Sequence, residues 1–209
     1  MYYKILDLPP LPDEYIKVAL ERAEIYCNAS IDERKQMRAN LLHDPNRPVI
    51  PIMKNGKDMY ARALPRLDLT DLLKDWVDQN ISKEYTQLHL ALNLDISPEP
   101  GKVKSDSLIA HTDQTRSYVL LYLIDVSNLD QDTVYYQEIG QTLHRKRNTI
   151  IEDYQKVKEV YRARYPLHQW VFMDATIIHD VENVQKNRTA IQIAFDIDPF
   201  GVMDWNNAV

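Results

Sequence analysis

The stretch YTQLHLALNLDI, residues 85–96, constrains the fold most because its apolar and polar residues alternate strictly. Successive side chains of a β-strand point to opposite faces, so the leucines at every second position form one apolar face. The other face carries Gln87, His89 and Asn93. We therefore predict a strand that packs its leucine face against a core and presents a polar second face.

The segments on either side of this strand differ in their periodicity. Apolar residues at helical spacing predict helices over 13–27, 30–42 and 68–81. Strand-like patterns follow over 117–126, 132–139, 169–181 and 188–197. A charged segment near 144–165 is predicted to be a helical insertion between strands. Helices followed by antiparallel-looking strands are typical of an α+β protein whose strands form a two-sheet β-roll or jelly roll.

The chain has 209 residues, which is enough for one domain with a sizeable core. We expect a single domain over 1–209. Its first part, residues 1–80, is expected to be mainly helical support. The strand core is expected to cover residues 85–198, with the helical insertion inside it.

Composition limits the classes of partner. The formal net charge is −6, which argues against nucleic acid, because binding it requires a basic footprint. Cys27 is the only cysteine, so there is no disulfide framework, and a reducing, cytoplasmic location is expected. The N-terminal residues lack the pattern of a secretory signal, and no apolar run reaches membrane-spanning length. No membrane partner is therefore expected.

A candidate metal site begins with His111 and Asp113. Residues at i and i+2 of a strand share one face, so these two side chains can bind one ligand. His179 comes at the end of an apolar strand-like run, where a sheet would hold it rigidly. Two imidazoles and one carboxylate occupy one face of an octahedron and leave three positions open, which is the arrangement that iron(II) oxygen chemistry requires.

Arg188 begins the last predicted strand and shares a face with small residues such as Ala190. A planar guanidinium suits bidentate binding of a carboxylate. A metal triad with an arginine nearby can bind a 2-oxo acid, whose oxo and C1 carboxylate oxygens would take two metal positions. Its distal carboxylate would meet the arginine. Lys186 has the same strand parity and is the alternative for this role.

The ordered set of His111-Thr-Asp113, His179 and Arg188 resembles the iron(II)/2-oxoglutarate-dependent oxygenase superfamily. The stretch HDVENVQKNRTAIQIAF, from residue 179, looks most like the prolyl 4-hydroxylase branch, where His-x-Val-x-x-Val precedes the basic residue that binds 2-oxoglutarate. The resemblance covers about residues 85–198. It implies a double-stranded β-helix, that is, a jelly-roll or cupin-like core, with supporting N-terminal helices.

The resemblance also implies an activity and roles for individual residues. His111, Asp113 and His179 would bind Fe(II), Arg188 would bind the distal carboxylate of 2-oxoglutarate, and Tyr122 would add a hydroxyl to that carboxylate. The implied enzyme is a dioxygenase that uses O2 and converts 2-oxoglutarate to succinate, with ascorbate as a supporting reagent. It would hydroxylate a C–H bond of a protein, a peptide or a small molecule.

The sequence departs from the family pattern outside the metal ligands. The glycines that many relatives carry before the third strand are missing from NLDQDTVYYQEIG, and Ala190 stands where many relatives have serine. These departures concern the substrate more than the cofactor. The alternative function is a non-catalytic β-roll module that binds a metal or another ligand. A His-x-Asp pair on a strand is, by itself, more often a surface polar pair.

Overall fold

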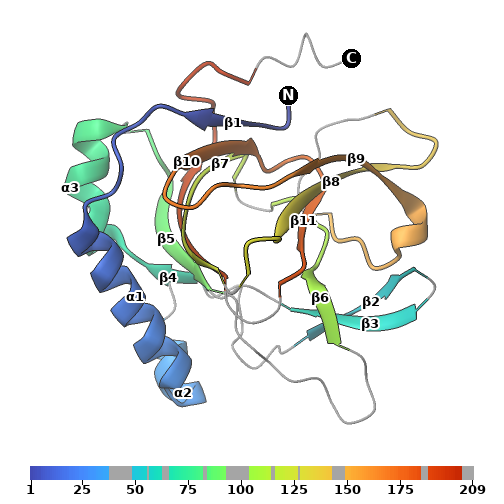
Figure 1. Ribbon diagram of the computed structural model, residues 1–209, viewed down its shortest axis with the longest axis horizontal. Helices are drawn as coiled ribbons and strands as arrows, with labels where there is room; N and C mark the ends of the chain where they lie inside the picture. The colour runs from blue at the N-terminus through green and yellow to red at the C-terminus, as the bar shows by residue number, and fades with distance from the viewer. Residues whose placement is uncertain are drawn as a thin grey trace.

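A computed structural model describes residues 1–37, 49–55, 57–62, 66–81, 84–92, 104–113, 116–126, 128–142, 149–184 and 188–203 (Figure 1). The three described α-helices all come before the main run of strands: α1 (Asp13–Asn28), α2 (Ile31–Met37) and α3 (Thr70–Asn80). The predictions of helices over 13–27, 30–42 and 68–81 are thus confirmed in the described residues, although α2 begins only at Ile31 and α3 covers only Thr70–Asn80. None of these helices is long and apolar enough to span a membrane.

Most of the strands belong to two sheets. The larger sheet has six strands in the order β1 (Tyr3–Leu6), β10 (Trp170–Asp174), β7 (Tyr118–Val126), β12 (Arg188–Phe195), β5 (Gln87–Leu92) and β4 (Arg66–Asp68). The second has the order β11 (His179–Glu182), β8 (Asp132–Glu138) and β9 (Val157–Ala163). A third sheet is formed by β2 (Val49–Lys54), β3 (Lys57–Arg62) and β6 (Lys104–Leu108), and a short 3-10 helix covers Tyr154–Lys156. The chain is therefore α+β, as expected.

Each face of the six-stranded sheet packs against a different layer. Alternate residues of β7 divide between the two faces: Tyr118, Leu120 and Tyr122 lie in the core under the helices, and Val119 and Leu121 lie in the core that β8 and β9 close. In Figure 1, α1 and α3 lie on one side of this sheet and β8, β9 and β11 on the other. The sheet is therefore the central layer of three.

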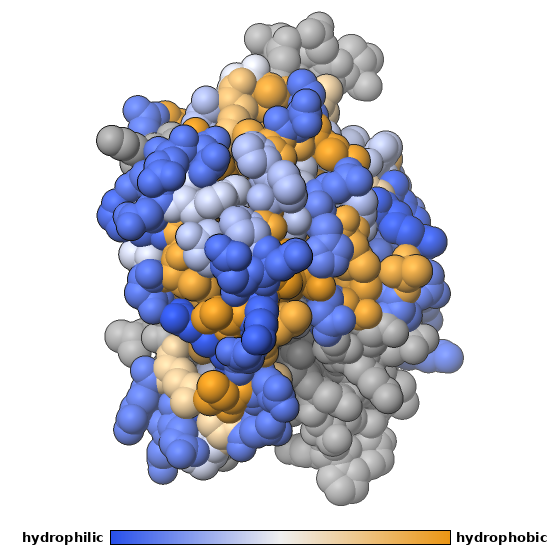
Figure 2. Space-filling model, turned by 60° about the vertical axis from the view of Figure 1, so that its left-hand side comes forward, coloured by the Kyte–Doolittle hydropathy of each residue, from blue (hydrophilic) through white to orange (hydrophobic). Residues whose placement is uncertain are grey.

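The helices cover the sheet with a narrow apolar stripe. Leu69, Leu73 and Val77 at α3 are fully buried, and Trp76 stacks on Trp170 with ring centroids 5.8 Å apart. Burial of each aliphatic side chain contributes roughly 1.5–3 kcal/mol. The outer surface of this side is largely hydrophilic with scattered hydrophobic residues (Figure 2). This layer explains why the leucine face of β5 is buried.

The polar face of β5 is also buried, because it faces the second sheet and not solvent. His89 is inaccessible and pairs in register with Gln192 of β12. The space between the two sheets therefore holds polar side chains as well as an apolar core.

The chain passes back and forth between the two main sheets. It runs through β7 in the large sheet, β8 and β9 in the small one, then β10 in the large, β11 in the small and β12 in the large. The segment after β6 joins the small sheet at β11 through His111 and His179. The range 169–181, predicted as one strand, is two strands in different sheets with a turn between them.

The predicted helical insertion near 144–165 is wrong over its described part, residues 149–165. Instead of a helix, the segment contains the short 3-10 turn and strand β9, which pairs antiparallel with β8. Residues 143–148 lie outside the described part. Strand β9 is at the edge of its sheet, and its residues Glu159 and Arg162 lie at the surface and form an ion pair. Edge strands commonly carry such charges, and the same charged pattern in the sequence is also typical of a solvent-exposed helix.

Candidate functional site

His111 and His179 lie side by side on neighbouring segments of the small sheet. Each donates its backbone N–H to the carbonyl of the other, at 2.9 Å in both directions. Their ring centroids are 4.7 Å apart. Directly opposed residues on one face of an antiparallel pair bring their side chains together, so the pairing itself aims both rings the same way.

The tautomer of both histidines follows from their backbone contacts. Nδ1 of His111 lies 2.8 Å from the carbonyl of Ile109, and Nδ1 of His179 lies 2.8 Å from the carbonyl of Ile177. A carbonyl only accepts, so each Nδ1 carries a proton and each ring directs its Nε2 away from its own backbone. Burial and the neighbouring His111 lower the pKa of His179 to about 4, so this ring is neutral at pH 7.

Asp113 lies beside these rings and is ionised. Its Oδ1 is 3.4 Å from Nε2 of His111, and its Oδ2 accepts a hydrogen bond from Nε of Arg116. Burial pushes the pKa of Asp113 up, but Arg116, His111 and Arg66 outweigh it and hold the pKa well below the usual range. The structure thus brings the three predicted ligands, His111, Asp113 and His179, close together.

The chemistry of these three side chains suits a divalent metal, but their present positions do not surround a single ion. Histidines that bind a metal through Nε2 usually donate their Nδ1–H to a carbonyl, which fixes the ring, and both rings have this bond here. Among the described residues, however, no three His, Cys, Asp or Glu side chains are grouped so that they could hold a metal ion as they stand. Joint binding of one ion therefore requires side-chain movement, and the Asp113 carboxylate is meanwhile held by arginines.

Arg188 lies in the same space between the sheets, with its side chain on the face of β12 that carries Ala190. It is buried, and its Nη1 lies 3.4 Å from Oε1 of Gln131. Burial lowers the pKa of Arg188 to about 10, which leaves it charged at pH 7. Lys186, the predicted alternative, lies outside the described residues.

Two tyrosines that the sequence analysis did not single out lie near Arg188. The hydroxyls of Tyr135 and Tyr165 are hydrogen-bonded to each other, and both rings are buried between the sheets. Tyr165 is close enough to Arg188 for the guanidinium to act on the pKa of its hydroxyl, and the ring centroid of Tyr135 lies 6.3 Å from that of His179. The alternation of side chains along β8 could have placed Tyr135 on the inner face. Tyr165 follows β9, so no strand alternation indicated its position.

The structure does not bring Tyr122 together with Arg188. Its ring lies in the core under the helices, 4.7 Å from the ring of Trp170, on the opposite face of the sheet from Arg188. Burial raises the pKa of Tyr122, against a hydrogen bond with the backbone of Leu11. Successive side chains of a strand point to opposite faces, so an error of one residue reverses the face. The run SYVLLYLIDV is apolar on both faces, so its sequence does not show which face a residue occupies.

A second polar cluster adjoins Asp113. Nη1 of Arg116 lies 3.0 Å from both Nε2 of His89 and Oε1 of Gln192. Nη2 of Arg66 lies 3.7 Å from Oδ1 of Asp113. Burial, followed by Arg66 and Arg116, lowers the pKa of His89 well below 6.5, so His89 is neutral. The sequence analysis placed His89 on the polar face of its strand and did not single out Arg66 or Arg116.

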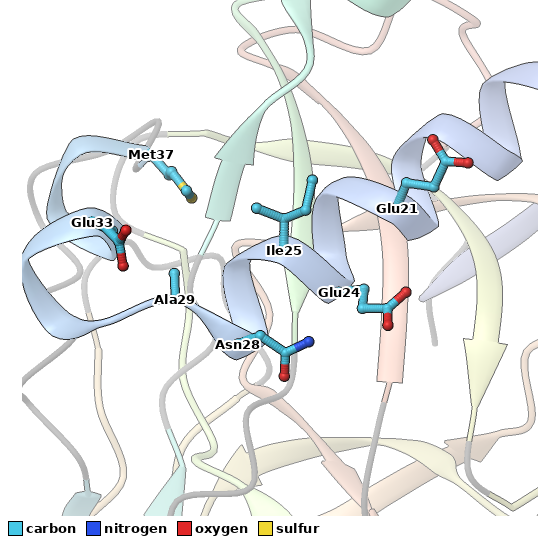
Figure 3. A pocket seen from close by; sticks show the side chains of 7 residues that line it. All are labelled: Glu21, Glu24, Ile25, Asn28, Ala29, Glu33 and Met37. Atoms are coloured by element: carbon cyan, nitrogen blue, oxygen red, sulfur yellow. The ribbon is translucent and has the colours of Figure 1, made fainter.

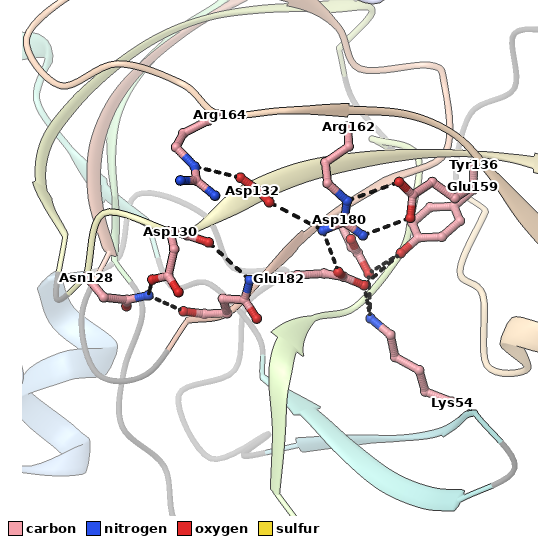
Figure 4. A network of polar contacts seen from close by, with 11 residues as sticks. Lys54, Asn128, Asp130, Asp132, Tyr136, Glu159, Arg162, Arg164, Asp180 and Glu182 are labelled. Carbon is pink, nitrogen blue, oxygen red and sulfur yellow. Dashed lines mark hydrogen bonds and ion pairs between the residues drawn. The ribbon is translucent and has the colours of Figure 1, made fainter.

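Asp180, the residue after His179 in β11, is a buried acid with several polar contacts. Oδ2 of Asp180 accepts hydrogen bonds from the hydroxyls of Tyr154 at 2.8 Å and Tyr136 at 3.2 Å. Nζ of Lys54 lies 3.6 Å from the same oxygen, and Figure 4 shows Lys54 and Tyr136 beside Asp180. Burial raises the pKa of Asp180 to about 7, although Lys54 acts in the opposite direction. Through Lys54 this network ties β2 to β11, the strand that carries His179.

A groove of about 550 Å³ lies elsewhere, between α1 and α2. Its lining includes Glu21, Glu24 and Glu33 with Ile25 and Met37 (Figure 3). These helices are on the far side of the six-stranded sheet from His111 and His179. The groove is therefore separate from the candidate site.

Comparison with known proteins gives similarities of structure only. No protein-family model and no curated protein sequence matches the chain. The structure is similar to SnoK, a non-heme α-ketoglutarate-dependent carbocyclase from nogalamycin biosynthesis, with 12% identity and a TM-score of 0.49 over 91% of this chain and 78% of that one.

Two further similar structures come from bacteria. A Pseudomonas putida prolyl-4-hydroxylase is 11% identical, with a TM-score of 0.41 over 93% of this chain and 92% of that one. Escherichia coli YcfD is 9% identical, with a TM-score of 0.44 over 94% of this chain, and this chain spans only 50% of its length. Because these identities and TM-scores are low, we base the proposed function on the site residues.

Proposed function

We propose that this protein is an iron(II)- and 2-oxoglutarate-dependent dioxygenase with a double-stranded β-helix core. It hydroxylates a C–H bond of a peptide or a small molecule and converts 2-oxoglutarate to succinate. The observation that carries the proposal is the pairing of His111 with His179, which frees two Nε2 atoms beside the ionised Asp113. Two nitrogens and one carboxylate oxygen are the ligand set of non-heme iron oxygenases.

Each residue of the proposed site has a distinct task. His111, Asp113 and His179 hold the iron, which with 2-oxoglutarate supplies the oxidising chemistry when bound. The carbonyls of Ile109 and Ile177 keep both imidazoles in the tautomer that can bind metal. For His179 no proton has to leave the ring on binding, because burial lowers its pKa to about 4 and leaves Nε2 with its lone pair.

Arg188 is proposed to bind the distal carboxylate of 2-oxoglutarate. It is buried and charged, and none of the contacts recorded for its side chain within the described residues is to a carboxylate. A buried guanidinium without a counter-charge is costly, so an incoming carboxylate is favoured. The hydroxyls of Tyr135 and Tyr165 are the proposed neutral donors beside it, in place of Tyr122.

The proposal is tested by turnover of the co-substrate. Purified protein is incubated with Fe(II), 2-oxoglutarate, ascorbate and O2, and succinate is measured. We expect slow succinate formation without a prime substrate, and none from His179→Ala. Absence of succinate from the wild-type protein under all metal and oxygen conditions, with a panel of peptides and amino acids present, would overturn the proposal.

The alternative is a non-catalytic module that uses the same fold for binding. It is favoured by one observation: the Asp113 carboxylate is engaged by Arg116 and Arg66, and no metal-holding group is formed among the described residues. Conversion of 2-oxoglutarate to succinate separates the two. The module forms no succinate, even where it binds Fe(II) or Mn(II).

A further inference from the structure

The cluster beside Asp113 has more positive than negative charge. The side chains of Arg66 and Arg116 are 11% and 4% exposed, and Asp113 is the one carboxylate among the described residues that contacts them. His89 contributes no charge, because its pKa lies well below 6.5. Two buried guanidinium groups therefore share a single carboxylate.

Arg66 is the member of this cluster with unused binding capacity. Its guanidinium makes no hydrogen bond to any described residue, and its buried Nε has no partner. Nη2, on the same edge of the guanidinium as Nε, is 3.7 Å from Oδ1 of Asp113, which is too far for a hydrogen bond. This edge is the one that binds a carboxylate with two parallel hydrogen bonds.

Buried His89 adds a second atom without a partner, its Nδ1. Arg116, in contrast, contacts Asp113 through its Nε and Gln192 and His89 through its Nη1. Arg116 thus fixes the cluster, and Arg66 is the group left open to a ligand. Buried polar groups without partners are rare in folded proteins and commonly mark functional positions.

We propose that Arg66 binds a carboxylate group of the substrate that is oxidised, at a subsite next to the metal position. This inference rests on the proposed function. In the proposed oxygenase, one carboxylate of 2-oxoglutarate binds Arg188 and the other binds the metal. The Asp113 carboxylate also binds the metal. Arg66 then has no counter-charge left, and an acidic substrate, such as a free amino acid or a carboxylate-bearing metabolite, supplies it.

The first experiment uses acetate as the carboxylate probe. Thermal unfolding is followed as acetate replaces chloride at constant ionic strength, both with the protein alone and with protein saturated with Mn(II) and N-oxalylglycine. We expect a saturable rise in Tm for the wild-type protein and an apparent affinity about 10- to 100-fold weaker in Arg66→Met. The control Arg22→Met removes an exposed arginine paired with Asp71 and leaves the response unchanged.

The second measurement asks whether Arg66 is only a structural partner of Asp113. A structural partner makes Arg66→Met less stable, whereas a ligand-binding arginine with unused hydrogen-bonding capacity gives a variant at least as stable as the wild type without ligand. If Arg66→Met does not fold, Arg66→Lys keeps the charge and loses the two-donor edge, and is expected to weaken acetate binding. An unchanged acetate response in the folded variant overturns the proposal.

The third measurement identifies the source of the carboxylate. Affinity for N-oxalylglycine is measured in the presence of Mn(II). An affinity within about 2-fold of wild type in Arg66→Met assigns the subsite to the substrate, and a loss of 10-fold or more assigns it to the co-substrate and overturns the proposal as stated. The acetate response of the unloaded protein does not require turnover, so failure of this inference and failure of the oxygenase proposal are distinguishable.

Discussion

His111 and His179 are hydrogen-bonded to each other through both backbone N–H groups, and each uses its own Nδ1 to bond a carbonyl two residues earlier. The two rings are thereby fixed before any ligand arrives. Preorganisation of this kind lowers the cost of binding, since little side-chain entropy remains to be lost. We therefore expect metal binding to depend on these two histidines.

The first prediction concerns the metal ligands. His179→Ala should lower Fe(II) affinity by at least about 100-fold and abolish succinate formation, because one of three ligands is lost. Anaerobic titration with Fe(II) or Mn(II) measures the affinity. His168→Ala is the control, since this histidine is exposed and its ring lies near that of Tyr122, not near His179. Full metal affinity in His179→Ala would remove the triad from consideration.

The second prediction assigns the distal carboxylate to Arg188 and not to Lys186. With iron saturating, Arg188→Ala should raise KM for 2-oxoglutarate by about 30- to 1000-fold, as expected for the loss of a buried charge-assisted pair. Lys186→Ala should change it little. The reverse pattern would move the role to Lys186. No change in either variant would mean that the co-substrate is not 2-oxoglutarate.

The third prediction compares tyrosines on the two faces of the sheet. Tyr135→Phe and Tyr165→Phe should each raise KM for 2-oxoglutarate by about 10-fold, because each removes a hydroxyl near Arg188. Tyr122→Phe should leave KM unchanged and cost about 1 kcal/mol of stability, since its hydroxyl bonds the backbone of Leu11. Steady-state kinetics and chemical unfolding separate the two effects. A raised KM in Tyr122→Phe alone would contradict the assignment.

The fourth prediction follows from the strand found where a helical insertion was expected. Ile151 is 8% exposed and packs in a core with Tyr154 and Val157, whereas the neighbouring Ile150 is 46% exposed. Ile151→Ala should lower the free energy of unfolding by about 2–5 kcal/mol, and the matched control Ile150→Ala by no more than about 0.5 kcal/mol. Urea denaturation measures both. Equal effects would mean that the segment is peripheral to the fold.

The fifth prediction concerns pH and His89. In the folded protein the pKa of His89 lies well below 6.5, through burial and the adjacent Arg66 and Arg116, whereas the unfolded chain takes up a proton near pH 6.5. Unfolding is therefore favoured as the pH falls below about 6.5, by up to about 1.4 kcal/mol per pH unit for this group.

His89→Gln keeps a polar side chain opposite Gln192 and removes the titration. The difference in unfolding free energy between wild type and variant should therefore shrink between pH 7 and pH 5. A pH-independent difference would show that folding does not lower the pKa of His89. Urea denaturation at fixed ionic strength across this range provides the comparison, and it isolates His89 from other groups that the two proteins share.

Local pattern was sufficient for some features of this chain. The alternation in 85–96 predicted that Leu88 and Leu90 pack into a core and that His89 shares the other face, and the structure confirms both. The spacing of His111 and Asp113 placed them together for the same reason, because side chains two apart on an extended segment point the same way. Such features depend on a few neighbouring residues, so sequence alone determines them.

Tertiary structure decided what lies across from each face. Tyr122 and Val119 occur in one apolar run, and only the helices on one side and β8 and β9 on the other distinguish their surroundings. Residues 157–163 became a strand because β8 offered an edge to pair with. Arg66 and Arg116 reach Asp113 from β4 and from the segment before β7. Pairings of this kind join distant segments and depend on the free energy of the whole packed core, which no local period encodes.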